Sequence, residues 1–133
     1  RGEGVRFRYA YDFWIHNLFS IGTTRDAILW RDSASFQATQ VRADFAGPGA
    51  TFGGGRYNGI HLVNVRHGTF GQTATDQANA EGIRIMTGSQ HLTFTGGWVR
   101  KSRRDTTLPE WQRQGIYVEP GSLAVEFAAV QAY

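Results

Sequence analysis

The acidic side chains of this 133-residue chain are the first place to look for catalysis. Hydrolysis of a glycosidic bond uses two carboxyl groups, about 5–5.5 Å apart in retaining enzymes and ~6.5–9.5 Å apart in inverting ones. The acids in or near the two longest polar stretches of the chain are Asp76, Glu81, Asp105 and Glu110. No two acids fall at equivalent positions of neighbouring repeats, so these four are candidates and the catalytic residues are unknown from the sequence.

Arg84 and Tyr117 form a second candidate pair, because the repeat described below places them next to each other on an outward face. Elimination from an acidic polysaccharide needs a base and a group that neutralises the uronate carboxylate. An Arg beside a Tyr can supply both. The alternative is an arginine side chain that lies over a surface tyrosine ring. Calcium would require clustered aspartates, and the sequence has no such cluster.

Sugar binding without cleavage needs flat aromatic faces and forked hydrogen-bond donors. The six predicted ligand-binding residues are Trp98, Trp111, Tyr117, Arg84, Arg103 and Arg104. In the alternative interpretation, Trp98 packs against the strands and Trp111 anchors its own loop. The sequence leaves both interpretations open.

Composition narrows the function further. The chain has no cysteine, a net charge of +3 and a pI of about 9.7. Its basic run at 100–104 is interpreted as a solvated loop, so no nucleic-acid partner is expected. No stretch reaches the ~18 consecutive apolar residues of a membrane span, so no membrane insertion is expected. The histidines lack metal-ligand spacing. We therefore expect no metal and no cofactor.

An irregular repeat must position these residues. Short alternating segments of period 2 recur, separated by Gly, Asn, Asp and Ser, and helical periodicity is absent. A first register holds the pairs Val5/Phe7, Ile28/Trp30, Ala50/Phe52, Ile83/Ile85 and Ile116/Val118. A second follows 8 to 10 residues later and begins at Phe13, Phe36, Ile60, Leu92 and Val125. Two short strands in each repeat predict a single-stranded parallel β-helix of about five turns.

In that geometry, equivalent residues of successive turns stack in columns about 4.8 Å apart. The four predicted inward columns are Val5–Ile28–Ala50–Ile83–Ile116, Phe7–Trp30–Phe52–Ile85–Val118, Phe13–Phe36–Ile60–Leu92–Val125 and Ile15–Ala38–Leu62–Phe94–Phe127. A corner of small residues is predicted at Ala10, Ser33, Gly55, Gly88 and Gly121, and a polar stack at Asn17, Gln40 and Asn64. The outward column of the second strands is predicted to be Trp14–Gln37–His61–Thr93–Glu126.

Residues 1–133 are expected to form a single domain, cut from a longer chain. The segments 66–81 and 98–114 are about nine residues longer than the other returns. They are predicted to be loops of consecutive turns that protrude side by side. Long loops on a rigid scaffold often carry binding sites.

The phrases GIRIMTGSQHLTFTGG, GIYVEPGSLAVEFAAV and YDFWIHNLFSIG carry a family resemblance. They resemble the turns of right-handed parallel β-helix proteins of the pectate-lyase-like superfamily, in which Gly-aliphatic-x-aliphatic is followed by a short turn and a second alternating strand. The resemblance covers nearly the whole chain. It specifies the fold and carries no catalytic motif.

Within this superfamily, the chain is most similar to bacteriophage tailspike and receptor-binding β-helix domains. The resemblance implies a homotrimer in the virion that binds bacterial surface polysaccharide. One alternative is a polysaccharide lyase or glycoside hydrolase with its site on the long-loop face. The other is a bacterial adhesin at the cell surface or outside the cell.

Overall fold

The computed structural model describes residues 2–48, 55–100, 107, 109 and 114–132. Within them the chain is all-β, as predicted, and no helix is present. The same described part therefore holds no helix that could cross a membrane. The strands are β1 (Val5–Arg8), β2 (Tyr11–Ile21), β3 (Ile28–Asp44), β4 (Ile60–Asp76), β5 (Ile83–Ile85), β6 (Gln90–Arg100), β7 (Ile116–Val118), β8 (Leu123–Ala128) and β9 (Gln131–Ala132).

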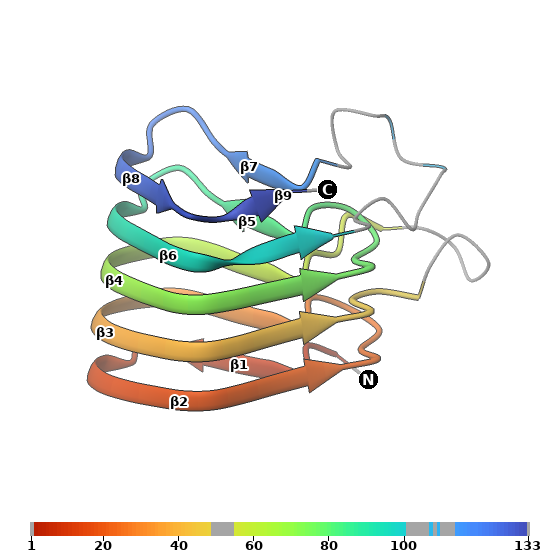
Figure 1. Ribbon diagram of the computed structural model, residues 1–133, viewed down its shortest axis with the longest axis horizontal. Coiled ribbons are helices and arrows are strands. Elements are labelled where there is room, and N and C mark those ends of the chain that lie inside the picture. Colours follow the sequence, from red (N-terminus) through yellow and green to blue (C-terminus); the bar gives the residue numbers. More distant parts are fainter. Residues whose placement is uncertain (1, 49–54, 101–106, 108, 110–113, 133) are drawn as a thin grey trace.

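The strands pair in parallel and belong to one sheet that does not close on itself. Figure 1 shows the long strands β2, β3, β4 and β6 stacked from the N-terminal end to the C-terminal end, with β1, β5 and β7 behind them. Neighbouring layers pair residue by residue, since Val5 pairs with Ile28, Ile28 with Ile60, Ile60 with Ile83, and Ile83 with Ile116. The chain thus consists of five stacked repeats of unequal length.

The third repeat corrects the predicted columns. Ile60 and Leu62 occupy the first register, where Ala50 and Phe52 were predicted, and Ala50 and Phe52 lie outside the described residues. Gly68 and Phe70 then occupy the second register, where Ile60 and Leu62 were predicted. The prediction is wrong because both stretches alternate with period 2, so alternation alone does not show which of them begins the repeat.

The long strands bend where single residues adopt the left-handed conformation. Positive φ recurs in three rows, at Tyr9, Asp32, Asn64, Gly88 and Gly121, at Asp12, Ser35, His67, His91 and Ala124, and at Asn17, Gln40, Gln72, Gly96 and Ala129. A single left-handed residue turns an extended chain without ending its pairing on both sides. The predicted corner is one residue off in the first two repeats and falls at Asn64, not Gly55, in the third. The polar stack continues through Gln72 and not through Asn64.

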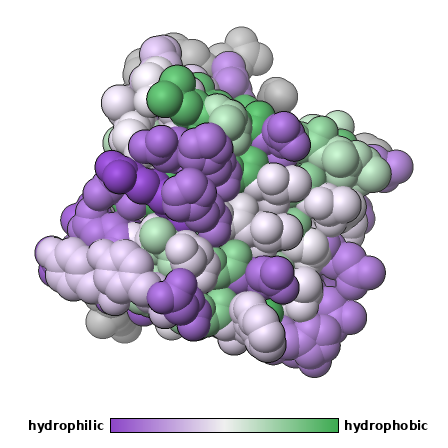
Figure 2. Space-filling view, turned by 90° about the vertical axis from the view of Figure 1, so that its left-hand side faces the viewer, coloured by the Kyte–Doolittle hydropathy of each residue, from purple (hydrophilic) through white to green (hydrophobic). Residues whose placement is uncertain are grey.

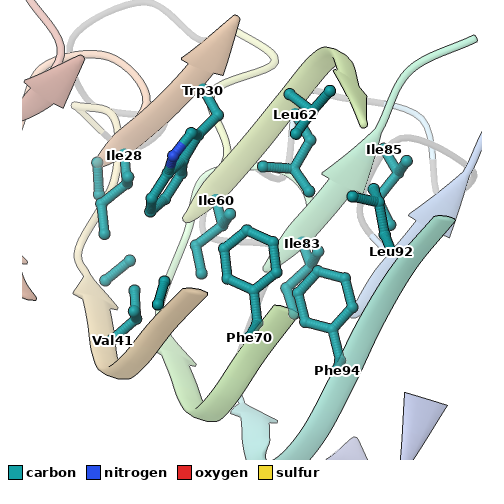
Figure 3. Close-up of a cluster of buried hydrophobic side chains, with 14 of the residues drawn as sticks. Ile28, Trp30, Val41, Ile60, Leu62, Phe70, Ile83, Ile85, Leu92 and Phe94 are labelled. Atoms are coloured by element: carbon teal, nitrogen blue, oxygen red, sulfur yellow. The ribbon is translucent and has the colours of Figure 1, made fainter. Parts of the chain in front are cut away.

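The core lies between the short first segments of the repeats and the bent second segments. Figure 3 shows Ile28, Trp30, Ile60, Leu62, Ile83 and Ile85 facing Phe70, Leu92 and Phe94. The Phe70 and Phe94 rings stack with centroids 4.6 Å apart, and Phe94 and Phe127 follow at 4.8 Å. Each such buried side chain contributes roughly 1.5–3 kcal/mol, so the aromatic column holds the layers in register. In the neighbouring column, Gly68 leaves room for the Phe36 ring, which lies where a Cβ would be.

The two long segments also differ from the prediction. Residues 66–76 belong to β4, and residues 98–100 to β6. Inward-facing Thr73 and Thr75 are buried, so the stretch that looks polar in the sequence is a strand packed on the core. The longer intervals between strands fall at 45–59 and 101–115. They separate β3 from β4 and β6 from β7, and are therefore not in consecutive repeats.

Candidate functional site

Two carboxylates meet at the ends of β3 and β4. Asp44 and Asp76 are the last residues of these strands and pair directly with each other in the parallel register. Adjacent parallel strands lie about 4.8 Å apart, so the two side chains leave neighbouring layers in the same direction. Asp44 is only 2% exposed, and Asp76 is partly buried. An acid pair at equivalent positions of adjacent repeats is the feature that the sequence did not predict.

The backbone fixes this pair. Both chains bend immediately afterwards, because Phe45 and Gln77 have positive φ. The Phe45 N–H donates to the Asp76 carbonyl oxygen at 2.8 Å, and the Gln77 N–H donates to the Arg100 carbonyl oxygen at 3.1 Å. The strand ends of β3, β4 and β6 are thus held in one row of equivalent positions, Asp44, Asp76 and Arg100.

The electrostatics of the pair are unbalanced. Burial raises the pKa of Asp44, the Arg42 guanidinium opposes this, and the charge of Asp76 raises the pKa further. Arg42 Nε donates to Asp44 Oδ2 at 2.7 Å. The Oδ1 atoms of Asp44 and Asp76 are both buried, and neither has a hydrogen-bond partner among the residues that the structure describes. Asp44 is therefore protonated more readily in the folded protein than in the unfolded chain.

Aromatic rings border the acids. The Arg42 guanidinium lies 5.5 Å from the Phe19 ring centroid and 5.7 Å from that of Trp98. Trp98 is partly exposed, so it can present ring surface to a ligand. We call Arg42, Asp44, Asp76, Trp98 and Arg100 the carboxylate site. It combines an acid whose pKa is raised, a second carboxylate and an aromatic face, and these are the groups that glycoside hydrolysis uses.

A second row of charged residues crosses the first segments of the repeats. Asp26 accepts hydrogen bonds from the Asn58 backbone N–H at 2.7 Å and the Asn58 side chain at 3.1 Å, and its other oxygen lies 2.8 Å from His61 Nδ1. Glu81 is fully buried and accepts from Arg56 Nε at 3.0 and 3.2 Å. Arg84 donates to Glu119 at 2.7 Å. We call these seven residues the paired ladder, namely Asp26, Arg56, Asn58, His61, Glu81, Arg84 and Glu119.

The structure separates the predicted site residues into three groups. Asp76 and Trp98 belong to the carboxylate site. Arg84 and Tyr117 are register neighbours as predicted, but Arg84 binds Glu119, and Tyr117 lies 5.1 Å beneath the Arg56 guanidinium. Glu81 is bound by Arg56 in the paired ladder. The remaining candidates, Asp105, Glu110, Trp111, Arg103 and Arg104, lie outside the described residues.

The outward columns also change. His61 follows Leu29 in the column Arg6–Leu29–His61–Arg84–Tyr117, and Thr69 takes its predicted place between Gln37 and Thr93. His61 and Glu126 are therefore not members of one column. No group of three or more metal-ligating side chains occurs within the described part of the chain.

Sequence reasoning missed Asp44 and Asp26. Asp44 ends the stretch VRAD and Asp76 ends the stretch TATD, so a signal was present once these two stretches are aligned. The sequence also contained a pattern that could have indicated the paired ladder. An acid or amide stands two residues before the first apolar residue of every repeat, at Glu3, Asp26, Asn58, Glu81 and Gln114. The misplaced third repeat concealed both patterns.

The sequence matches no known protein-family model and no curated protein. The structure is similar to the crystal structure of a protein from Parabacteroides merdae that is described as a "putative glycosyl hydrolase", with a TM-score of 0.59 and 10% sequence identity. The similarity covers 82% of this chain and 41% of that protein, so the chain spans less than half of its length. At this level of identity, the similarity shows a shared fold and no more.

Proposed function

We propose that the chain is a segment of a right-handed parallel β-helix that binds bacterial surface polysaccharide, as phage tailspikes do. The parallel pairing, the five stacked repeats and the bends at left-handed residues support the fold. Figure 2 shows the side on which the strands bend. Hydrophilic residues cover much of it, and the hydrophobic ones form separate patches. A mixed surface of this kind suits a hydrated carbohydrate ligand better than a large apolar partner.

The observation that carries this proposal is the exposure of Trp14. Its side chain projects outward from β2 with 84% of its surface exposed. It lines a hollow of about 190 Å³ together with Ile15, His16, Gln37 and Thr39. His16 Nδ1 lies 2.7 Å from the Thr39 hydroxyl, so the polar groups beside the ring are held in place. A flat ring next to fixed polar groups can stack a sugar and bind its hydroxyls.

The test compares Trp14→Ala with Leu123→Ala, since Leu123 is a large exposed side chain on β8, outside both the hollow and the carboxylate site. Binding to purified capsular polysaccharide and O-antigen is measured by calorimetry. Removing a central aromatic contact is expected to weaken binding about thirtyfold, whereas Leu123→Ala should change it by less than about threefold. Equal binding by wild type and Trp14→Ala, or no binding of either polysaccharide by the wild type, would contradict the proposal.

A tailspike segment is also expected to be a homotrimer in the virion. Phe19 and Ile21 are each 55% exposed on β2 and offer an apolar surface to a second copy. The mass in solution tests this part. A monomer at micromolar concentration would favour the adhesin among the binding functions.

The carboxylate site favours glycoside hydrolysis as a second candidate function. Asp44 would protonate the leaving oxygen while Asp76 attacks the anomeric carbon and forms a glycosyl ester. Water, deprotonated by Asp44, would then hydrolyse this ester and regenerate both side chains. The backbones of adjacent strands are about 4.8 Å apart, which favours the short carboxyl separation of retaining enzymes, ~5–5.5 Å, so retention of configuration is the expected outcome. Trp98 would stack a neighbouring sugar.

The assay measures new reducing ends after incubation with the bound polysaccharide, and ultraviolet absorbance detects the unsaturated ends of a lyase reaction. Asp44→Asn and Asp76→Asn should each lower hydrolysis by at least about a hundredfold. Asp12→Asn, at an exposed acid on β2, is the matched control. If the wild type binds the polysaccharide but forms neither product, the chain is a binding protein.

A further inference from the structure

Four arginines surround a hollow on the first two repeats. Arg6 and Arg8 project from β1, Arg31 from β3, and Arg25 precedes β3. With Glu3 and Leu29 they line a space of about 230 Å³. All four arginines are exposed, whereas Leu29 is only 5% exposed although it occupies an outward position. We call these six residues the arginine hollow. Its volume is below the ~300 Å³ of the smallest drug-sized pockets, so it suits one charged group or one sugar ring.

Positive charge is concentrated in this hollow. Four guanidinium groups face one carboxylate, an excess of three positive charges, which equals the formal net charge of the whole chain. Arg25 and Arg31 make no side-chain hydrogen bond within the described residues, so their donors are available. Exposed arginines of this kind bind carboxylate, sulfate and phosphate groups through two parallel hydrogen bonds.

Two of the arginines oppose each other directly. Arg8 pairs with Arg31 in the parallel register of β1 and β3, so two like charges leave adjacent strands in the same direction. Like charges in direct register destabilise a sheet. Arg8 reduces this only in part, by donating to the Tyr9 hydroxyl at 3.0 Å and lying 4.7 Å from its ring centroid. An anion between the two guanidinium groups would remove the repulsion.

Glu3 shows that the hollow accepts a carboxylate. Arg6 donates to it at 2.7 Å. Burial raises the pKa of Glu3, but its backbone hydrogen bond and the charges of Arg6 and Arg25 outweigh this and lower the pKa overall. Glu3 occupies the Arg6 and Arg25 side of the hollow and leaves the Arg8–Arg31 side without an anion.

The geometry points to an anion subsite between Arg8 and Arg31 that takes the carboxylate or sulfate of an acidic polysaccharide. This inference rests on the proposed polysaccharide function. Three exposed aromatic residues, Tyr9, Tyr11 and Trp14, follow the hollow in the sequence, and such rings can stack sugars. A nucleic acid would instead favour a basic track that neutralises many successive phosphates. The described arginines of the hollow form one compact group.

The experiment uses the whole chain and three proteins, namely wild type, the double variant Arg8→Gln/Arg31→Gln, and Arg66→Gln. Arg66 is an exposed arginine on β4, outside the hollow, and serves as the matched control. The probes are alginate, carboxyl-reduced alginate, dextran sulfate, dextran and single-stranded DNA. Affinity electrophoresis measures retardation, and thermal unfolding in added sulfate measures binding of the free anion.

We expect alginate or dextran sulfate to retard the wild type and Arg66→Gln equally, and the double variant at least about tenfold less. Which of the two polymers binds distinguishes a carboxylate from a sulfate ligand. Sulfate should raise the melting temperature of the wild type more than that of the double variant. Without anion, the double variant should be at least as stable as the wild type, because the like-charge pair is gone.

Three results would overturn the inference. One is equal binding of the acidic polymers by wild type and double variant. Another is binding of carboxyl-reduced alginate or dextran as strong as that of the charged polymers, which would leave polysaccharide binding intact and remove only the anion subsite. The third is binding of single-stranded DNA that is tighter than either acidic polymer and depends on Arg8 and Arg31. If no polysaccharide of any kind binds, the proposed function fails as well.

Discussion

The paired ladder and the carboxylate site are both rows of charged residues across parallel strands, but their charges are satisfied differently. In the paired ladder, Asp26 is bound by Asn58 and His61, Glu81 by Arg56, and Glu119 by Arg84. In the carboxylate site, two acids stand in direct register, and Arg42 donates to Asp44 alone among the described pairs. Within the described residues, one buried oxygen of each acid has no hydrogen-bond partner.

This difference indicates separate roles. A buried carboxylate whose oxygens are bound by side-chain donors is costly to disturb, and its acceptors are already used. A carboxyl with a raised pKa beside a second carboxylate is poised to exchange a proton, and such groups cluster at functional sites. We therefore expect substitutions in the paired ladder to reduce stability, and substitutions in the carboxylate site to reduce function at little cost in stability.

Glu81→Ala should have the largest effect on stability. Its carboxylate is fully buried, and its removal leaves the Arg56 guanidinium, which is 18% exposed, without its main partner. Breaking a buried ion pair from one side costs about 3–5 kcal/mol. Urea unfolding followed by circular dichroism measures the loss. A loss of less than about 1 kcal/mol, which is typical of surface ion pairs, would contradict a structural role for the paired ladder.

Asp26→Ala should rank second. The carboxylate accepts two hydrogen bonds from Asn58 and contacts His61 at 2.8 Å, and the residue is 8% exposed. Losing a charged acceptor of buried donors costs about 2–3 kcal/mol. Urea midpoints provide the measurement, and Asp12→Asn is the control. If Asp26→Ala and Asp12→Asn unfold at the same urea midpoint, the hydrogen bonds of Asp26 do not stabilise the fold.

Glu119→Gln should cost less, about 1 kcal/mol, because Gln keeps an uncharged acceptor for Arg84 and the Glu119 side chain is 17% exposed, whereas that of Glu81 is fully buried. Although burial raises the pKa of Glu119, hydrogen bonds from Arg84 and Thr87 lower it overall. The folded protein therefore binds fewer protons than the unfolded chain. The stabilisation by ionised Glu119 is present above pH 4.5 and is lost as the pH falls below this value. Glu119→Gln should flatten the acid side of the stability profile. An unchanged profile would show that the pair is not formed.

Asp44→Asn should have the smallest effect on stability and the opposite sign. Burial raises the pKa of Asp44 above 3.8, and Asp76 adds to this, so the folded state binds more protons than the unfolded chain. The stabilisation that protonated Asp44 contributes is fully present below pH 3.8, and it declines as the pH rises through the pKa of the folded state. At neutral pH the variant should equal the wild type or exceed it by up to about 1 kcal/mol. Thermal unfolding across pH tests this, and destabilisation at neutral pH would place Asp44 among the structural acids.

The sequence predicted the class of the fold well. Period-2 alternation and repeated small residues indicated an all-β chain with parallel pairing, and the neighbours Val5 and Ile28, Ile83 and Ile116, and Arg84 and Tyr117 are as predicted. It failed in the third repeat. Gly68 occupies a core position there, and no residue-by-residue pattern shows that the Phe36 ring fills the space above it.

Because the third repeat was misplaced, the carboxylate site was not predicted. The carboxylate pair exists only when β4 is aligned so that Asp76 stands beside Asp44. The sequence by itself determined which apolar residues of the alternating segments face inward, because side-chain alternation follows from the local geometry of an extended chain. Only the tertiary structure decided which layers and which acids are neighbours. Register between strands depends on the packing of whole layers, and the intervals of 45–59 and 101–115 can shift it without changing local alternation.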